Sequence, residues 1–404
     1  MAVRWRGLTS RVRVETGTSG KRTAVIAVGL VVAMTGTMLL LGVGISSARP
    51  DLANIGAWLA SAVSGEVVHA NGLSGQVDGR VRLAAAEKGA LKITEDGNSI
   101  LVLDDGTGKV SRIDPTQLNV AQKTSLGAEG VRLVSGSGKT YAIDPRAGTV
   151  RQLDPLRLNT IGSPITLKPP LGQGGIDKNG TLWVPVPRSG TVAQIQGAQQ
   201  GEAVTVGEPG DPLTLTMAQG VPVVTDSAAA SAAVLGPTGI QLKVSLPSTV
   251  TQAGPAGVLA PIRTEGPIVP ILAPQQGTLV LLDVTSGGLN TVSVRGGRLG
   301  SPQALGHRVY ITDESSGRLI VYDAAAGRFE PEVVVTGKAG PLDVFVRDGL
   351  LWVNDQFSAT AIVVQADGAM HRVGKYETSP GTTTATPTPI PVPSLPATTG
   401  PARP

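Results

Sequence analysis

Short runs of apolar residues, separated by Asp-Gly or other Gly-containing turns, alternate along most of the chain. One run is Leu351-Trp352-Val353-Asn354-Asp355, and Val309-Tyr310-Ile311-Thr312-Asp313 and Thr140-Tyr141-Ala142-Ile143-Asp144 closely resemble it. Runs of this length that are rich in β-branched and aromatic residues and bounded by turn residues are typical of β-strands. The pattern therefore predicts an all-β protein.

These runs recur as an internal repeat. Aligned on the centre of the run, eight copies are spaced by 40 to 47 residues, with the widest gap between Val223 and Pro270. Seven residues further on, six of the copies have Gly, and twelve residues further on all eight have an apolar residue. Agreement at several aligned positions of the eight copies indicates true repeats. The central positions of the eight copies are Trp58, Leu101, Tyr141, Trp183, Val223, Pro270, Tyr310 and Trp352.

Each repeat contains enough apolar runs for about four strands. The copy around Tyr310 is followed by an apolar run ending at Asp323, by Glu332-Val333-Val334-Val335, and by Pro341-Leu342-Asp343-Val344-Phe345-Val346. Four strands in about 42 residues is the spacing of a propeller blade. The sequence predicts a β-propeller over residues 50–376, with eight blades favoured and seven possible. The first copy lacks room for one strand, so we expect strands from the two ends of this region to share a blade.

The motif that begins at Pro341 and continues through Asp348-Gly349 and Leu351-Trp352-Val353-Asn354-Asp355 resembles the blade repeat of NHL-like and YVTN-type β-propellers. This resemblance implies the fold and leaves the function open, because such repeats serve many roles. The whole layout is similar to that of membrane-anchored propeller proteins of actinobacteria. In those proteins a fibronectin type III module often follows the propeller, and no such module follows here.

The segment from Thr23 to Ser47 carries no charged residue over 25 positions, long enough for a helix to cross a bilayer. Residues 1–22 hold six basic residues and one acidic residue. The positive-inside rule then predicts a cytoplasmic tail at 1–22, a transmembrane helix at 23–47 and an extracytoplasmic propeller. A signal peptide cleaved near Ser46-Ser47-Ala48, giving a secreted protein, is the alternative.

Composition excludes several classes of function. The chain has no cysteine, which rules out disulfides, thiolate metal sites and a cysteine nucleophile. Its net charge of +4 is exceeded by the +5 of residues 1–22, so the remaining chain carries −1 and no basic nucleic-acid surface is expected. Residues 377–404 form a Thr/Pro-rich tract that predicts a disordered linker or tail.

No group of residues in the sequence matches a catalytic motif. The histidines His69, His307 and His371 occupy three different positions of three repeats, which disfavours a shared metal site. A Ser-His-Asp triad stays open, because its members assemble from residues that are distant in sequence. Gly136-Ser137-Gly138-Lys139-Thr140 resembles part of a P-loop, but it leads into a predicted strand and not into a helix. We therefore interpret it as a turn, and we predict no catalytic, cofactor-binding or metal-binding residues.

Two sets of residues recur in phase with the repeat. The aromatic residues at the central positions are predicted to pack between neighbouring blades, although a sugar-binding platform is the alternative. Five aspartates stand three residues after the central positions, and we expect them to cap turns, since Asp side chains bond nearby backbone amides. A ring of these carboxylates holding Ca²⁺ is the alternative. The five are Asp104, Asp144, Asp226, Asp313 and Asp355.

The sequence thus predicts a membrane-anchored, extracytoplasmic β-propeller that acts as a non-catalytic binding or scaffold module of the cell envelope. Its expected partner is an envelope protein, a peptide or a glycan. The alternative is a lyase or hydrolase with the fold of streptogramin lyases or lactonases, acting on an extracellular small molecule or polysaccharide. Such an enzyme would need polar residues to converge inside the ring, and His307 and His371 are the candidates.

Overall fold

The computed structural model describes residues 55–83, 90–127, 129–254 and 257–376. The chain divides into two units, 1–54 and 55–404, and all described residues belong to the second. The predicted cytoplasmic tail, transmembrane helix and Thr/Pro tract lie outside the described residues. Among the residues that are described, no helix is long and apolar enough to span a membrane.

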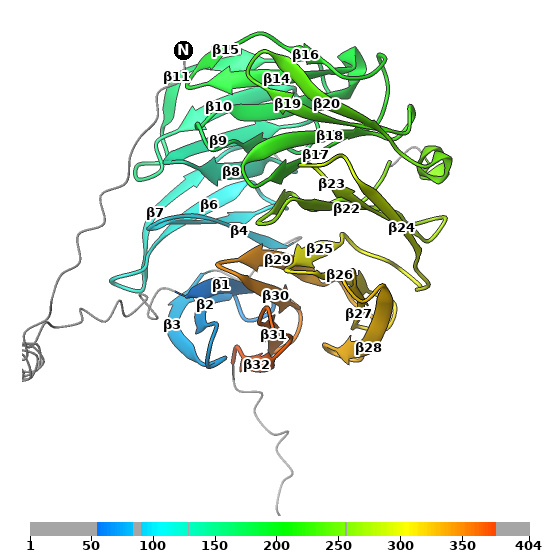
Figure 1. Cartoon of the computed structure of the whole chain (residues 1–404). Helices are drawn as coiled ribbons and strands as arrows, with labels where there is room; N and C mark the ends of the chain where they lie inside the picture. The colour runs from blue at the N-terminus through cyan, green and yellow to red at the C-terminus, as the bar shows by residue number, and fades with distance from the viewer. Residues whose placement is uncertain (1–54, 84–89, 128, 255–256, 377–404) are drawn as a thin grey trace, which may run out of the picture. The chain divides into compact units, whose positions relative to one another are not determined.

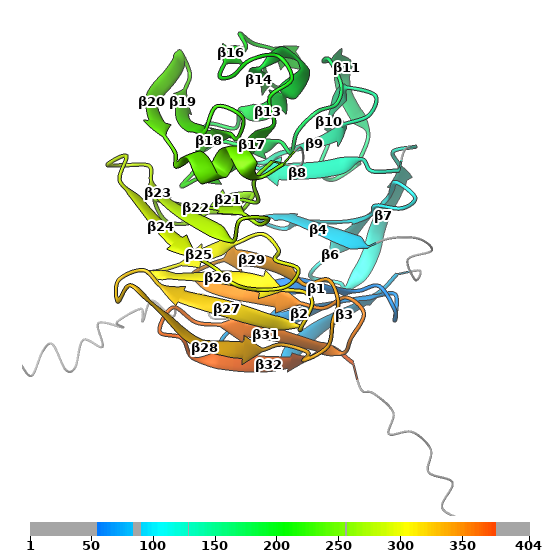
Figure 2. The same cartoon turned by 90° about the vertical axis from the view of Figure 1, so that its right-hand side faces the viewer.

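The described residues form eight antiparallel sheets arranged as the blades of a β-propeller (Figure 1). Strands follow each other outward within a blade, and from blade 1 to blade 8 the innermost strand of each blade contacts that of the next. The ring closes where β1 of the first blade contacts β30 of the last, and both views show these blades side by side (Figure 2). The predicted eight-blade propeller is confirmed.

The first four blades run from Gly56 to Thr205. Blade 1 contains β1 (Gly56–Ser61), β2 (Glu66–Asn71) and β3 (Val77–Arg82), and blade 2 contains β4 (Leu91–Asp96), β5 (Ser99–Asp104), β6 (Lys109–Asp114) and β7 (Asn119–Ser125). Blade 3 contains β8 (Arg132–Gly136), β9 (Lys139–Asp144), β10 (Thr149–Leu153) and β11 (Thr160–Thr166). Blade 4 contains β12 (Gly175–Ile176), β13 (Leu182–Val186), the 3₁₀ helix η1 (Pro187–Ser189), β14 (Thr191–Gln196), β15 (Gln199–Gln200) and β16 (Val204–Thr205).

The other four blades run from Leu213 to Gly374. Blade 5 contains β17 (Leu213–Ala218), β18 (Val221–Asp226), β19 (Ser231–Gly236) and β20 (Gly239–Ser245), followed by the 3₁₀ helix η2 (Ser248–Gln252) and by β21 (Arg263–Thr264). Blade 6 contains β22 (Ile268–Ala273), β23 (Thr278–Asp283) and β24 (Leu289–Ser293), and blade 7 contains β25 (Gln303–Leu305), β26 (Arg308–Asp313), β27 (Arg318–Asp323) and β28 (Arg328–Val334). Blade 8 contains β29 (Asp343–Arg347), β30 (Leu350–Asn354), β31 (Thr360–Val364) and β32 (Met370–Gly374).

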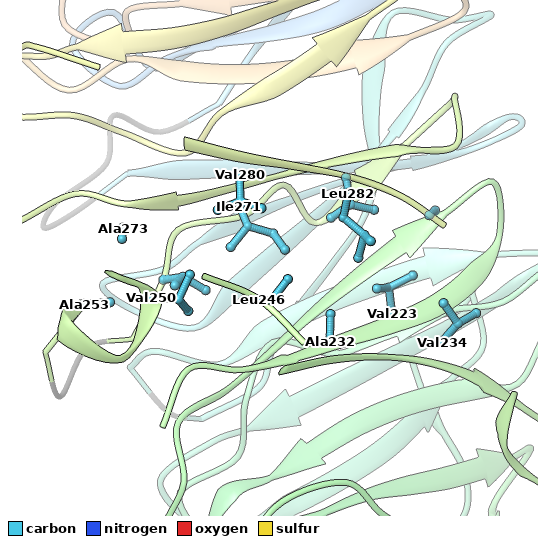
Figure 3. Close-up of a cluster of buried hydrophobic side chains, with 13 residues drawn as sticks. Val223, Ala232, Val234, Leu246, Val250, Ala253, Ile271, Ala273, Val280 and Leu282 are labelled. Carbon is cyan, nitrogen blue, oxygen red and sulfur yellow. The ribbon is translucent and has the colours of Figure 1, made fainter. Parts of the chain in front are cut away.

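The hydrophobic core is divided among the eight interfaces between neighbouring blades. Each interface holds one cluster of buried apolar side chains, such as the cluster between blades 5 and 6 in Figure 3. The central aromatic residues Tyr141, Trp183 and Trp352 are at most 1% exposed, and each packs toward the following blade. The predicted packing role is confirmed, and a sugar-binding platform built from these buried rings is excluded.

A glycine after the second described strand of a blade lets the chain turn sharply and return. At Gly148 the φ angle is 70°, which an L side chain rarely adopts. Its carbonyl oxygen accepts a hydrogen bond from Leu167 N, the residue that follows the outermost strand β11. The equivalent bond recurs in every blade. The repeat position seven residues after the central one, which is Gly in six copies, therefore accepts the hydrogen bond that ties down the end of the outermost strand. The donors are Leu83, Leu126, Leu167, Val206, Leu246, Val294, Val335 and Lys375.

Strands from the two ends of the described region do not share a blade. Strands β1 to β3 pair only with each other, and so do β29 to β32. The expectation of a shared blade is therefore wrong for the residues that the structure describes. The ring is closed by side chains instead.

Candidate functional site

The inner side of blade 1 is where the ring departs most from its repeat. Within the described range, β1 is the innermost strand of this blade, whereas its counterpart in most other blades is the second strand. Hydrogen bonds from neighbouring blades cover the inner edge of β1. Trp58 N donates to Glu95 Oε1 at 3.2 Å, and Ala62 N donates to Gln356 O at 3.0 Å. Groups of blades 2 and 8 thus take the place of a fourth strand.

Lys375 completes this replacement from the end of blade 8. Its Nζ donates to Ala60 O at 3.1 Å, to Asn354 Oδ1 at 2.8 Å and to Asp355 O at 2.5 Å. Asn354 Nδ2 donates to the same Ala60 oxygen at 3.0 Å. The lysine is 0% exposed, and burial lowers its pKa to about 8 against the opposing effect of the Asp355 charge. The ammonium group therefore stays mostly protonated at neutral pH.

Lys375 stands where the other seven blades carry Leu or Val. Those apolar residues follow the outermost strand and pack against the next blade. The blade that follows Lys375 is blade 1. At this point blade 1 presents the carbonyl group of Ala60, which, among the described residues, accepts hydrogen bonds only from side chains of blade 8 and the residue after it. An amine can satisfy that carbonyl, while a methyl group cannot.

Two ion pairs join blades 2 and 8 across blade 1. Arg347 Nη1 lies 2.8 Å from Glu95 Oε2, and Lys92 Nζ lies 3.3 Å from Asp343 Oδ1. Burial raises the pKa of Glu95, and the Arg347 guanidinium opposes that shift. The Gln356 amide also bridges the gap, since it bonds both the N–H and the carbonyl of Leu91 at 2.9 Å.

Four polar side chains occupy the same register of four innermost strands. Their pairing partners all stand two residues after a central position of the repeat. We call these four residues the inner polar layer: Lys92, Arg132, Thr214 and Asp343. All four keep part of their surface exposed. Residues at one register of the innermost strands approach each other around the ring axis, so this layer is the best candidate for a ligand site.

Arg132 is the member of this layer with an unused charge. Its guanidinium makes no hydrogen bond or ion pair with any described residue, whereas Lys92 and Asp343 neutralise each other. Burial lowers the pKa of Arg132, and no neighbouring carboxylate opposes that shift. A partly desolvated guanidinium without a partner favours an anionic group, most of all a carboxylate or phosphate that its planar fork can bind.

None of the three histidines lies on an innermost strand. His69 is on β2 and bonds Asp78 Oδ1 at 2.5 Å. His307 is in the turn before β26, 3.7 Å from Asp323 Oδ2, and His371 is on the outermost strand β32 beside Gln365. The predicted separation is confirmed. The enzyme hypothesis needs polar residues that converge inside the ring, and neither His307 nor His371 stands on an innermost strand.

The P-loop-like segment is a hairpin turn. Ser137 and Gly138 connect β8 to β9 with φ angles of 52° and 73°. Lys139 donates to Gly180 O of the next blade at 2.8 Å, and Asp96 of the previous blade accepts from Gly138 N at 2.7 Å. The segment links three blades and does not cradle a phosphate.

The recurring aspartates cap turns, as predicted. In each of the five, one carboxylate oxygen accepts the N–H of a residue two positions ahead, as Asp144 does from Arg146 at 3.0 Å. A continuous calcium-binding ring is not formed, because each carboxylate is tied to its own blade. The described residues contain no group of three or more His, Asp or Glu side chains arranged to hold a metal ion.

A pocket of about 310 Å³ lies away from the inner polar layer, between the outer parts of blades 4 and 5. It opens where the outer strand of blade 4 is split into β15 and β16, and Glu202 is the one charged residue in its lining. No motif or repeat of the sequence predicts this pocket. Its lining contains no pair of groups suited to acid–base or nucleophilic chemistry.

No protein-family model matches the sequence, and no curated protein matches it. Several solved structures share the fold. Virginiamycin B lyase from Staphylococcus aureus is 12% identical with a TM-score of 0.53, covering 66% of this chain and 92% of the lyase. AztD from Citrobacter koseri is 15% identical with a TM-score of 0.55, covering 78% of this chain and 94% of AztD. BamB from Moraxella catarrhalis is 14% identical with a TM-score of 0.54, covering 80% of this chain and 93% of BamB.

At these identities the likeness extends to the fold alone. The comparisons bear out the β-propeller and its expected similarity to a streptogramin-type lyase. They identify neither the NHL or YVTN family nor a fibronectin type III module. One further structure is a catalytically inactive histidine-to-alanine variant of the virginiamycin B lyase with quinupristin, so that a histidine matters in that enzyme.

Proposed function

We propose that this protein is a membrane-anchored, extracytoplasmic β-propeller that binds an acidic peptide segment of an envelope protein without catalysing a reaction. The anchor is the uncharged segment 23–47 behind a basic tail, which favours a cytoplasmic N-terminus. The propeller then lies outside the cytoplasm. The observation that carries the binding role is the unpaired Arg132 within the inner polar layer.

The choice of an acidic peptide follows from the chemistry of this layer. Lys92 and Arg132 outnumber Asp343 by one positive charge, and Thr214 adds a hydroxyl group. Glutamate and aspartate side chains can bind the guanidinium in a bidentate manner, and partner backbone groups can bond to threonine. A layer formed by several strands around one axis also suits a short extended segment.

The binding experiment uses the full chain in detergent micelles and a fluorescent Glu-rich decapeptide. Binding followed by fluorescence anisotropy is expected to weaken at least tenfold in Arg132→Glu. The matched control is Arg328→Glu, the same charge reversal at an exposed position on the outermost strand β28. Binding by the control alone supports the proposal. Equal binding by both variants, no binding to the peptide, or preference for a uronic-acid oligosaccharide contradicts it.

The topology is tested separately in sealed, right-side-out membrane vesicles that contain the full chain. Protease added outside is expected to cleave a tag after residue 404 and to spare a tag before residue 1. Extraction by carbonate, or protection of the C-terminal tag, would contradict an anchored extracytoplasmic propeller. Release of a shortened chain would indicate a cleaved signal peptide instead.

The second candidate is a lyase or hydrolase, and the fold likeness to virginiamycin B lyase favours it. None of the three histidines lies on an innermost strand, which argues against it. Activity toward a streptogramin substrate that disappears when His69, His307 and His371 are all replaced by Ala would support the enzyme. The proposed binding role predicts no turnover by the unchanged chain or by the variant in which all three histidines are replaced.

A further inference from the structure

Among the five recurring aspartates, Asp226 differs from the others in the surroundings of its second carboxylate oxygen, the one that does not cap the turn. Asp104, Asp144 and Asp313 keep contact with solvent, which can hydrate the oxygen that does not cap the turn. Asp226 and Asp355 are buried, with 2% and 8% of their surface exposed. A buried carboxylate is costly unless a cation or hydrogen-bond donors compensate it.

The two buried aspartates meet opposite surroundings. Asp355 lies beside the Lys375 ammonium, whose positive charge compensates its own. Asp226 Oδ1 accepts from Ala228 N and Ala229 N at 3.0 Å each, but its Oδ2 has no partner among the described residues. No lysine, arginine or histidine acts on Asp226.

The nearest charged group is a second carboxylate. Asp211 belongs to the segment that joins blade 4 to β17, and its Oδ2 accepts from Glu208 N at 2.8 Å. A methyl group on the Gly207 Cα would lie 2.5 Å from Asp226 Oδ2 and 3.1 Å from Asp211 Oδ2. The two oxygens therefore lie close together beside the Gly207 Cα, where a side chain would clash with the Asp226 oxygen. Burial raises the pKa of Asp226, and the neighbouring Asp211 raises it further.

We propose that Asp211 and Asp226 bind a calcium ion beside Gly207. Calcium is a hard cation that prefers carboxylate oxygens at 2.3–2.6 Å and completes its shell with water and carbonyl oxygens. Two carboxylates facing one space without a cationic side chain supply the charge that such an ion neutralises. With two protein carboxylates, the site belongs with weak extracellular calcium modules, whose dissociation constants are about 10⁻⁴–10⁻³ M.

The experiment measures calcium binding to the full chain after removal of divalent ions with EDTA. Isothermal titration with CaCl₂ is expected to show one site in that range, and 5 mM CaCl₂ is expected to raise the unfolding temperature. Asp226→Asn and Asp211→Asn should each weaken binding at least tenfold. Asp144→Asn, which alters an exposed turn cap of the same kind, should bind as the unchanged chain does.

The Asp211→Asn variant also keeps the test decisive if Asp226→Asn fails to fold. An amide at position 211 can donate a hydrogen bond to Asp226 Oδ2, so this variant should unfold at a higher temperature than the unchanged chain in EDTA and should no longer respond to calcium. A chain that shows no calcium response up to 10 mM shares a proton between the carboxyl groups instead, which overturns the proposal. Equal calcium binding by Asp211→Asn and the unchanged chain also overturns it.

Discussion

Blades 1 and 6 both lack the first antiparallel strand of the repeat in the described residues, yet the ring fills the two positions differently. In blade 6 the chain itself fills the position. Leu259 exchanges two backbone hydrogen bonds of 2.8 Å with Leu272, and β21 then pairs in parallel with β17 of blade 5. In blade 1 the position is filled by Glu95, Arg347, Asn354 and Lys375, side chains of blades 2 and 8.

A missing strand can thus be replaced by neutral backbone or by charged side chains. The two replacements differ in how the stability of the blade depends on pH and salt. Backbone bonds in blade 6 keep the same strength over a wide range of pH. Val250 of η2 and Ala253, which follows η2, add buried apolar surface there (Figure 3). Blade 1 depends on groups that gain or lose protons, so we expect its stability to vary with pH and salt.

The largest effect is expected from Arg347→Ala, which leaves Glu95 buried without its cation. Removing one partner of a buried ion pair costs about 3 kcal/mol or more. Burial already raises the pKa of Glu95, and loss of Arg347 raises it further. The folded state then binds a proton that the unfolded state lacks above pH 4.5. The loss measured by urea denaturation should therefore be smaller at pH 5 than at pH 8. An equal loss at both pH values would contradict this account.

Lys375→Leu introduces at blade 8 the residue type found at this position in other blades. We nevertheless expect it to lower the free energy of unfolding by about 3 kcal/mol, because several buried oxygens lose their donor. Lys338→Leu, at an exposed lysine of the connection between blades 7 and 8, should change it by less than about 0.5 kcal/mol. A neutral or stabilising Lys375→Leu would show that blade 1 needs no amine to close the ring.

The amine of Lys375 also gives the fold a pH dependence at alkaline pH. Its folded pKa of about 8 lies below the ordinary value of 10.5, so between these values the unfolded chain binds more protons. The free energy of unfolding should therefore rise with pH across this window, by about 2–3 kcal/mol relative to Lys375→Leu. Chemical denaturation of both chains at pH 7.5 and 10 measures the difference. A parallel pH dependence in the two chains would be the contrary result.

Thr216→Val tests blade 6. The Thr216 hydroxyl donates to Pro261 O at 2.7 Å and holds the segment 257–264 against blade 5. We expect a loss of about 1 kcal/mol that does not change between pH 5 and pH 9. Hydrogen exchange should quicken in 257–264 and not in β1. Faster exchange in blade 1 would mean that the two replacements are coupled.

The smallest effect is expected from Lys92→Ala. The side chains of Lys92 and Asp343 are 52% and 37% exposed, and exposed ion pairs contribute about 0–1 kcal/mol. The loss should shrink further in 1 M NaCl, where exposed charges are screened. A loss above 2 kcal/mol that is insensitive to salt would place this pair among the groups that close the ring.

The repeat made most of the fold predictable. Central residues such as Tyr141 and Trp352, the glycines and the turn aspartates carry local requirements of packing, φ angle and capping that sequence alone displays. The gap of 47 residues between Val223 and Pro270 marked blade 6, whose extra residues include η2 and the segment that leads to β21. The path of that segment could not be predicted, because it depends on Thr216 and β17 in the folded ring.

The candidate site was less accessible from sequence. Arg132 becomes notable only when three-dimensional register aligns it with Lys92 and Asp343. Lys375 did leave a signal, since it interrupts a column that is apolar in the other seven repeats. Asp226 left none, because its partner Asp211 lies outside the repeated positions and the burial that distinguishes it arises only on folding.

Because every described strand pairs within a blade made of consecutive residues, apart from β21, the boundary between blades 8 and 1 cuts no sheet. A gene that gains or loses one repeat of about 42 codons would therefore add or remove a whole blade and leave the others intact. The interface clusters on either side of the change would then have to match new neighbours, and at the boundary between blades 8 and 1 so would the side chains that bridge blade 1. The number of blades is thus free to evolve, while the groups at the closing boundary constrain which copies can come first and last.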